Sequence, residues 1–318
     1  MPGTSPDSVT FTSYNTMDLF ESRLPRAQLH YISVVELIRT LRPDVLAVQE
    51  IRGRPRQSTI WLRTLAYDTG MKCEIASGRR GEPEVALAIG SHGYHSGLLW
   101  QPGTDVVSGS FRETEPGRLY HSAAWLTFRF DGRLVRLASF HATPFDRELR
   151  ARENSALLSM LTEGPGGDLP LLIGGDWNAE SADLVLDEST GKHVLYEPGD
   201  PFAGAAWQDD MIHQCYFSEE PDGTRHWVDR SAGEVLRDGG LHDAAAVLRA
   251  PWQATSGHFP GDGYGAVGIL RRIDAIRVTE DVVPALRKYR VVDNDKARRA
   301  SDHLPVTVEF VPADIAAI

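Results

Sequence analysis

The chain has 318 residues, of which 42% are hydrophobic, and a formal net charge of −11 at pH 7. This composition excludes a disordered chain, and the acidic charge repels nucleic acid and anionic membranes at long range, although it leaves room for a local basic patch. No apolar run approaches the roughly 20 residues of a membrane span, and the N-terminal stretch has neither the basic nor the apolar region of a secretory signal. We therefore expect a cytoplasmic protein, with a secreted mature form as the alternative.

The first half of the chain predicts a strand, a helix and a second strand. Residues 9–14 alternate in polarity like a strand, and residues 45–48 form a short, apolar, β-prone run. Between them, Pro25 opens a helix that ends at Pro43. The apolar stripe of this helix is expected at Leu29, Ile32, Val35, Ile38 and Leu41.

Later segments predict a strand at 134–140, followed by a helix whose N-terminus lies at Thr143 and Pro144. Residues 169–173 form another buried strand. The last two expected strands lie at 273–278 and 305–310.

The segment from about 181 to 268 has poor periodicity and is rich in Gly, Pro, Asp and aromatic residues. We expect long loops and short elements here, within a single domain that spans residues 1–318. Core or loop packing is the expected role of its aromatic residues, with stacking on a base or substrate ring as the alternative; these are Trp207, Trp227, Trp252 and Tyr264. Cys73 and Cys215 are expected to be buried, reduced thiols, and a disulfide is the alternative.

Polar residues recur where the apolar strands end. Their acids and imidazoles are costly to bury unpaired, and strand ends bring such side chains together at one edge of a sheet. Oxygen ligands of this kind suit Mg²⁺ or Mn²⁺. By contrast, the spacing of His213, Cys215, His226, His242 and Asp243 fits no standard zinc pattern. The strand-end residues are Asn15, Glu50, His141, Asp176, Asn178, Asp274, Asp302 and His303.

The same segments resemble the sequential motifs of the endonuclease/exonuclease/phosphatase superfamily. The resemblance spans nearly the whole chain, and its most specific motifs are GGDWNAE and SDHLPV. It implies an α/β fold of the DNase I-like type, a four-layer sandwich of two mixed β-sheets packed face to face with helices outside. The motifs are SYN at 13–15, PDVLAVQE at 43–50, SFH at 139–141, GGDWNAE at 174–180, RRID at 271–274 and SDHLPV at 301–306.

The resemblance also implies a role for each motif residue. Asn15, Glu50 and Asp302 resemble the metal-side residues, with Glu50 as the principal Mg²⁺ ligand. Asp176 resembles the residue that orients or deprotonates the attacking water, and Asn178 a ligand to phosphate or metal. His141 resembles a donor to a phosphate oxygen, while Asp274 orients the imidazole of His303, which binds or protonates phosphate.

Two features depart from the family pattern. AP endonucleases of the superfamily have an Asp two positions after the motif Asn, where this chain has Met17, so Asp18 is not assigned as a ligand. The tyrosine that contacts phosphate in the nuclease members has no clear equivalent, and Tyr94 and Tyr120 are the candidates.

Basic residues next to the motifs suggest a local basic rim around the site, with ordinary solvated loop positions as the alternative. Arg52 is the strongest candidate for substrate binding, because its position matches an Arg of DNase I-like nucleases and its planar fork suits phosphate. His258, in a Gly-rich segment before RRID, is a weaker candidate for a substrate-side residue. The rim residues are Arg52, Arg54, Arg56, Arg271, Arg272, Lys296, Arg298 and Arg299.

Three functions are compatible with this pattern. The leading hypothesis is a Mg²⁺- or Mn²⁺-dependent nuclease, a phosphodiesterase that attacks phosphate with an activated water and that we expect to be a monomer. The second is a phosphatase or phosphodiesterase for a small or lipid-like phosphate, which the charge of −11 favours. The third is a non-catalytic binding module on the same fold, against which the intact set of polar residues argues.

Overall fold

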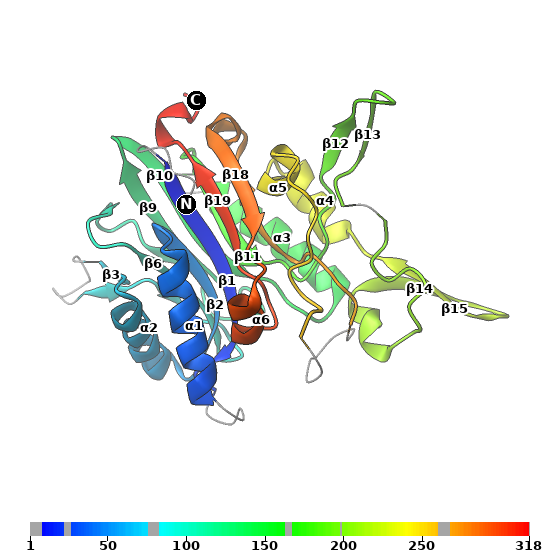
Figure 1. Ribbon diagram of the computed structural model, residues 1–318, viewed down its shortest axis with the longest axis horizontal. Helices are drawn as coiled ribbons and strands as arrows, with labels where there is room; N and C mark the ends of the chain where they lie inside the picture. Colours follow the sequence, from blue (N-terminus) through cyan, green and yellow to red (C-terminus); the bar gives the residue numbers. More distant parts are fainter. Residues whose placement is uncertain are drawn as a thin grey trace.

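The structure is a computed structural model that describes residues 8–21, 27–75, 83–162, 167–197, 199–259 and 268–317. Its centre is a pair of mixed β-sheets packed face to face (Figure 1). In sheet 1 only β1 and β2 are parallel among the paired strands. The order of sheet 1 is β18 (Leu286–Val291), β19 (Val306–Phe310), β1 (Val9–Leu19), β2 (Val45–Arg52), β6 (Tyr94–Trp100) and β5 (Leu87–Ala88).

In sheet 2 the parallel pair is β10 and β11, and the other described pairs are antiparallel. The order of sheet 2 is β16 (His242–Asp243), β17 (Asp274–Val278), β11 (Leu171–Asp176), β10 (Arg133–His141), β9 (Ser122–Phe130) and β7 (Asp105–Val106), with β8 (Arg112–Glu113) also paired to β9.

Helices cover the outer face of each sheet (Figure 1). On sheet 1, α1 (Ala27–Leu41), α2 (Pro55–Thr69) and α6 (Asp295–Ala300) bury apolar side chains against the strands. On sheet 2, α3 (Arg147–Thr162) and α4 (Ser231–Asp238) do the same. The predicted four-layer α/β sandwich is thus confirmed, and its central core includes Phe11, Leu137, Leu172, Ile276 and Val308.

Two details of the predicted helices are wrong. On α1, Leu29 is 60% exposed and Ile32 is 43% exposed, while the buried side chains are Val34, Val35, Leu37 and Ile38. The helix packs on the sheet through its middle turns. The buried positions therefore lie there and do not follow the apolar period along the whole helix. The later helix begins at Arg147, because the carboxylate of Asp146 accepts a hydrogen bond of 3.0 Å from the backbone N–H of Leu149, as an N-cap residue does.

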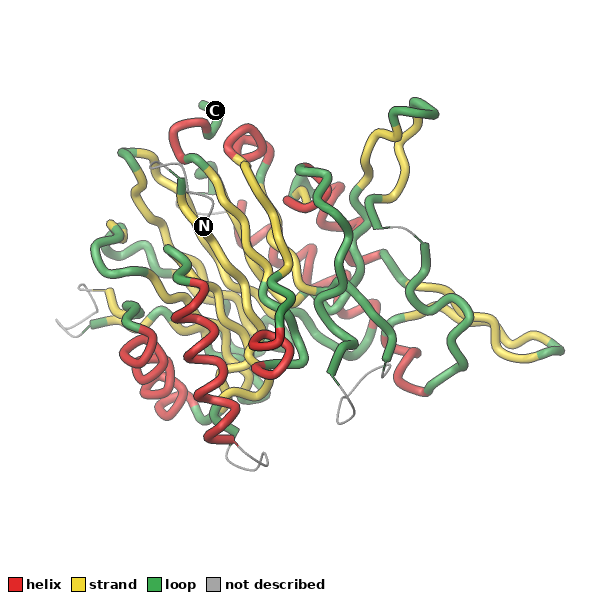
Figure 2. Tube along the Cα trace, in the orientation of Figure 1, coloured by secondary structure: helices red, strands yellow, loops and turns green. Residues whose placement is uncertain are grey.

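The segment from about 181 to 268 contains more regular structure than we expected. Two β-hairpins project from the body of the molecule (Figure 2). Between and after them, short elements return the chain to sheet 2. The hairpins are β12–β13 (Leu184–Asp187 and Lys192–Leu195) and β14–β15 (Cys215–Glu220 and Gly223–Val228), and the short elements include the 3-10 helix η1 (Asp209–His213) and α5 (Ala244–Val247).

The remaining short elements lie at the edges of the sheets. They are β3 (Glu74–Ile75), β4 (Glu84–Val85) and the 3-10 helices η2 (Glu280–Ala285) and η3 (Pro312–Asp314). Cys73 and Cys215 are buried free thiols, as predicted. A search of the described helices found no segment with both the length and the apolarity to cross a membrane.

Gly174 allows the two sheets to approach each other behind the motif GGDWNAE. A Cβ atom at this position would lie 2.6 Å from Cβ of Ser13 on β1 and 3.3 Å from Cζ of Phe11. Both distances are shorter than an ordinary van der Waals contact, so β1 and β11 pack at a separation that only glycine permits.

We predict that Gly174→Ala lowers the free energy of unfolding by about 1–3 kcal/mol, because the added methyl group overpacks the contact between the sheets. Urea denaturation monitored by circular dichroism measures this loss. The control is the double variant Ser13→Gly/Gly174→Ala, in which the opposing Cβ is absent. Its loss should be smaller than the sum of the two single losses by at least about 0.5 kcal/mol, and strict additivity would contradict a direct clash.

Candidate active site

An irregularity in the parallel pair β1–β2 positions the first site residues. The strands pair regularly up to Asn15 and Gln49 and resume at Leu19 and Ile51. Within this break, Glu50 has a φ of 63°, a left-handed conformation that is uncommon for residues other than glycine. β-Bulges of this kind often lie next to active sites, where they redirect a side chain.

On sheet 2, strand register aligns the polar side chains that end three neighbouring strands. His141 on β10 is the partner of Asp176 on the parallel strand β11. Asp176 is in turn the partner of Asp274 on the antiparallel strand β17. Directly opposed residues project to the same face of a sheet, so these three side chains form one row at its edge.

Asn15 joins the two sheets through its side-chain amide. Its Nδ2 donates to Oε1 of Glu50 at 3.0 Å and to Oδ2 of Asp176 at 2.9 Å. The hydroxyl of Ser301 donates to the backbone carbonyl of Asn15 at 2.9 Å and fixes the loop that carries His303. Residues from near the two ends of the chain therefore meet around the carboxylate of Asp176.

His303 and Asp274 form the predicted imidazole–carboxylate pair. Nδ1 of His303 lies 2.8 Å from Oδ2 of Asp274, and Nε2 lies 3.8 Å from Oδ2 of Asp176. Burial alone would lower the pKa of His303, but the carboxylates of Asp274, Asp176 and Asp302 together raise it well above its ordinary value. His303 is therefore protonated, donates a hydrogen bond from Nδ1 to Asp274 and presents a second N–H toward Asp176.

His141 lies on the other side of Asp176 and has the opposite charge state. Its Nε2 is 3.5 Å from Oδ2 of Asp176. Burial, with a further contribution from the positive charge of His303, lowers the pKa of His141 to about 3, so the imidazole is neutral. His121, which the motifs did not indicate, stacks on His141 with ring centroids 4.0 Å apart and also has a strongly lowered pKa because of burial.

Glu50 lies in a group of partly buried carboxyl groups. Burial, followed by the charges of Asp18 and Asp302, raises the pKa of Glu50 to about 8. The backbone N–H of Asp18 donates to Oε2 of Glu50 at 2.6 Å, so this residue lies in the site although the motif comparison gave it no role. The positive φ values of Met17 and Asp18 bring Asp18 there, and the sequence offers no signal for them.

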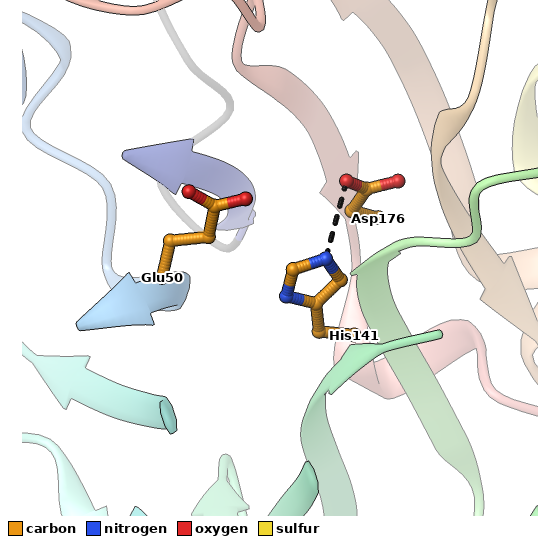
Figure 3. A group of neighbouring side chains, drawn as sticks. All are labelled: Glu50, His141 and Asp176. Carbon is orange, nitrogen blue, oxygen red and sulfur yellow. Dashed lines mark ion pairs between the residues drawn. The ribbon is translucent and has the colours of Figure 1, made fainter. Parts of the chain in front are cut away.

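The arrangement of these side chains fits a divalent cation. Two groups of possible metal ligands share Asp176. The first adds Glu50 and His141 and the second adds Asp274 and His303, and within each group the ligand atoms lie within 4.8 Å of one another. Figure 3 shows the first group, with Glu50 from β2 and His141 from β10 both directed toward Asp176 on β11. Crowded, buried carboxylates are unfavourable without a neutralising charge, and oxygen donors suit a hard ion.

The other predicted residues also lie near this centre. Asn178 donates from its backbone N–H to Asp176 (2.9 Å) and from Nδ2 to the carbonyl of Ala142 (3.1 Å). Asp302 is partly exposed and accepts a hydrogen bond from Ser301 at 3.3 Å. His258 contacts the backbone carbonyl of Ser301 at 3.2 Å, which places it beside the Asp302 loop.

Arg52 lies next to the carboxylate group, but it has protein partners. Its Nε is 3.2 Å from Asp18, its Nη2 is 3.4 Å from Glu21, and its guanidinium lies 3.9 Å above the ring of Tyr94. Of the two candidate tyrosines, Tyr94 contacts Arg52 and lies at the border of the site. Tyr120 stacks on His92, with ring centroids 4.1 Å apart.

The predicted basic rim is wrong in part. Arg271 and Arg272 are buried, and Arg272 pairs with Glu197 and Asp243 in the interior. Arg298 is exposed but pairs with Asp293. Buried arginines of this kind stabilise the fold and are not accessible to a polymer.

The middle segment adds nothing to the metal-compatible groups. Within the described ranges, none of these groups contains His213, Cys215, His226, His242 or Asp243. Tyr264 lies outside the described residues.

Comparison with known proteins identifies the family. The pattern of the Endonuclease/Exonuclease/phosphatase family matches residues 17–303. Comparison with curated protein sequences found no match.

Solved structures of similar fold include a family member from Bacteroides thetaiotaomicron, with 18% identity and a TM-score of 0.57 over 96% of this chain and 98% of that chain. The mannosyl-6-phosphatase of the same organism has 17% identity and a TM-score of 0.56, covering 94% and 98% of the two chains. TDP2 from Caenorhabditis elegans has 16% identity and a TM-score of 0.52, covering 96% and 74%. At these identities the likeness shows the DNase I-like fold alone, whereas the family match over most of the sequence shows that the chain is a member of the endonuclease/exonuclease/phosphatase family of phosphoester hydrolases.

Proposed function

We propose that this protein is a divalent-metal-dependent hydrolase of a small phosphate ester. The observation that carries the proposal is the position of Asp176, whose carboxylate lies within 3.8 Å of donor atoms from Asn15, His141 and His303. A negatively charged phosphoryl group needs positive charge and hydrogen-bond donors placed in advance, and these side chains with a bound cation supply them.

Metal binding is assigned to the side of the site where Asn15, Glu50 and Asp302 lie, with Asp18 beside them. The ion, when bound, neutralises these carboxylates and polarises the phosphoryl oxygens. Mg²⁺ or Mn²⁺ matches the oxygen-rich donor set. The raised pKa of Glu50 supports this assignment, since it results first from burial and then from the charges of Asp18 and Asp302.

The residues of sheet 2 are assigned to water and phosphate. Asp176 accepts the proton of the attacking water at its carboxylate, which Asn15 and the backbone of Asn178 hold in orientation. The charged His303, held by Asp274, donates from Nε2 to a phosphoryl oxygen. Neutral His141 donates one further hydrogen bond, and Asn178 contributes the carbonyl end of its amide.

The charge distribution favours a small ester over nucleic acid. The net charge is −11, and of the residues expected to form a basic rim, Arg272 is buried, Arg298 is paired and Arg52 contacts Asp18 and Glu21. The exposed members of the rim are Arg54, Arg56, Lys296 and Arg299, which lie on two separate segments of the chain. A polymer requires several accessible cations along its backbone. The nuclease that the motifs favoured stays a prediction, as do its cytoplasmic location and monomeric state.

We predict that Asp176→Asn and His303→Gln each lower kcat for a phosphate ester by about 10²–10⁴-fold, because each removes a proton-transfer or charge-stabilising group. Turnover of p-nitrophenyl phosphate and bis(p-nitrophenyl) phosphate with Mg²⁺ or Mn²⁺ measures the loss, and EDTA should abolish the activity. Asp222→Asn, at an exposed hairpin position, is the matched control and should retain full activity.

Plasmid DNA and RNA are incubated in parallel under the same conditions. Nicking that is lost in Asp176→Asn would establish the nuclease instead of the small-ester enzyme. If no ester is cleaved and calorimetry detects no Mg²⁺ binding, the protein is a binding module.

We also predict a pH-dependent effect of Glu50 on stability in metal-free buffer. The pKa of Glu50 is raised to about 8 in the folded protein from an ordinary value near 4.5, so the folded state binds more protons between these values. Stability contributed by this group must therefore fall as the pH rises toward 8. The difference in unfolding free energy between wild type and Glu50→Gln, measured by urea titration, should decrease from pH 6 to pH 8.5.

Added Mg²⁺ should reverse this loss in the wild type and raise its melting temperature more at pH 8.5 than at pH 6. Glu50→Gln should respond weakly at both values. If the difference in unfolding free energy between wild type and Glu50→Gln does not change with pH in metal-free buffer, the raised pKa of Glu50 is refuted. If Mg²⁺ raises the melting temperature of the variant as much as that of the wild type, the metal role of Glu50 is refuted.

A further inference from the structure

A small cavity of about 70 Å³ opens beside the site, on the side of the segment that follows β11. This volume is enough for several ordered waters or for part of a small polar ligand. Its lining includes Glu180, Glu197, Arg230, Trp252, Arg271 and Arg272. None of these residues has a part in the reaction assigned above.

Glu180 is the unexplained group in this cavity. Its side chain is only 2% exposed, and within the described part of the chain neither carboxylate oxygen has a hydrogen-bond partner. Burial raises the pKa of Glu180 to about 7, an effect that nearby Arg271 opposes. Buried polar groups are nearly always hydrogen-bonded, so a carboxylate without a partner from another described residue, on a residue that lines a cavity, points to a ligand that donates to it.

Most of the other charged groups in the wall already have partners. Glu197 accepts from Arg230 at 3.0 Å, from Arg272 at 2.9 Å and from the backbone of Ser181 at 3.0 Å. Arg272 also pairs with Asp243. These ion pairs hold the wall in shape and leave Glu180 and Arg271 as the groups with unused hydrogen-bonding capacity.

Arg271 is positioned by its backbone. Its N–H and carbonyl pair with Ser256, while its Nε has no partner among the described residues. At the mouth of the cavity, Trp252 is 39% exposed and Leu270 is 51% exposed, so an apolar surface borders the opening. The cavity therefore combines a buried acceptor, a buried donor and an indole.

This combination selects one kind of ligand. The wall carries charges of both signs, from Glu180 and Glu197 and from Arg230, Arg271 and Arg272, so a neutral ligand suits it better than a strongly charged one. A hydroxyl group both donates and accepts, so neighbouring hydroxyls can satisfy a carboxylate and a guanidinium together. The C–H face of a cyclic polyol would also pack on the indole of Trp252, since aromatic side chains bury large apolar areas.

Chain geometry places this cavity within reach of the phosphate site. Glu180 follows Asn178 by two residues, and Arg271 precedes Asp274 by three. A fully extended chain covers roughly 3.3–3.6 Å per residue, which limits these Cα separations to about 7 Å and about 11 Å. Glu180 and Arg271 therefore lie within the length of one small molecule from Asn178 and Asp274.

We propose that this cavity binds the neutral, polyhydroxylated alcohol portion of the phosphate ester, with Glu180 and Arg271 contacting its hydroxyl groups and Trp252 packing on its ring. The proposal rests on the proposed function, because it names the leaving alcohol of the same reaction. Glu180 and Trp252 are thereby assigned as specificity-determining residues.

Paired substrates test this assignment. The first group consists of glucose 6-phosphate, mannose 6-phosphate, myo-inositol 1-phosphate and glycerol 3-phosphate, and p-nitrophenyl phosphate is the ester without hydroxyls. Glu180→Ala and Trp252→Ala should raise KM for the best polyol phosphate at least 10-fold while kcat changes less than 3-fold. For p-nitrophenyl phosphate, both kcat and KM of these two variants should stay within 2-fold of the wild-type values.

The matched controls are Glu188→Gln and Trp227→Ala, which change an exposed glutamate and another exposed tryptophan outside the cavity lining. Neither control should alter KM for the polyol phosphate. An equal loss with both substrate types in Glu180→Ala would overturn the proposal, because Glu180 would then support the catalytic centre and not a separate subsite. No preference of the wild type for any polyol phosphate over p-nitrophenyl phosphate in kcat/KM would also overturn it.

A binding measurement separates this proposal from the proposed function. Methyl α-glucopyranoside, methyl α-mannopyranoside and myo-inositol are titrated into the metal-free protein while tryptophan fluorescence is recorded. A saturable change that is lost in Trp252→Ala but kept in Trp227→Ala supports the subsite even if every phosphate ester proves inert. If no polyol binds and neither Glu180→Ala nor Trp252→Ala changes KM for a polyol phosphate, the proposed subsite is refuted, whether or not the protein hydrolyses phosphate esters.

Discussion

The site depends on the contact between the two sheets at Asn15 and Asp176. An amide from sheet 1 donates to a carboxylate from sheet 2 and also to Glu50, so the relative position of the sheets determines the distance between the two halves of the site. Gly174 permits that closeness, and Gln49 and Ser139 add a buried hydrogen bond of 3.0 Å across the same interface. The packing between the two sheets therefore also determines the geometry of the candidate site.

Opposite charges are arranged around this contact. The carboxyl groups of Glu50, Asp18 and Asp302 lie together on one side, and His303 carries positive charge that Asp274 stabilises on the other. His141 stays neutral although it is close to both, because burial and the positive charge of His303 lower its pKa. Two imidazoles within reach of one carboxylate thus have different protonation states, which gives the site a charged donor and a neutral one.

The sequence predicted the strand-end residues because register in a sheet is regular. His141, Asp176 and Asp274 end adjacent strands, and their alignment follows from the ordinary pairing of those strands. Asp18 and His121 were not predicted, because one depends on positive φ angles within a bulge and the other on a ring stacked across strands. The burial of Arg272 was also missed, since the acidic partners Glu197 and Asp243 are distant in sequence.

The projecting hairpin β14–β15 has a consequence for engineering. Pro221 and Asp222 at its tip are exposed, while its base is fastened by the hydrogen bond of 2.9 Å from Val228 to Asp200. Exposed tips of this kind accept inserted residues more readily than packed segments. A fluorescent label or an affinity peptide placed between these two residues would therefore report on the folded enzyme from a point outside the sandwich.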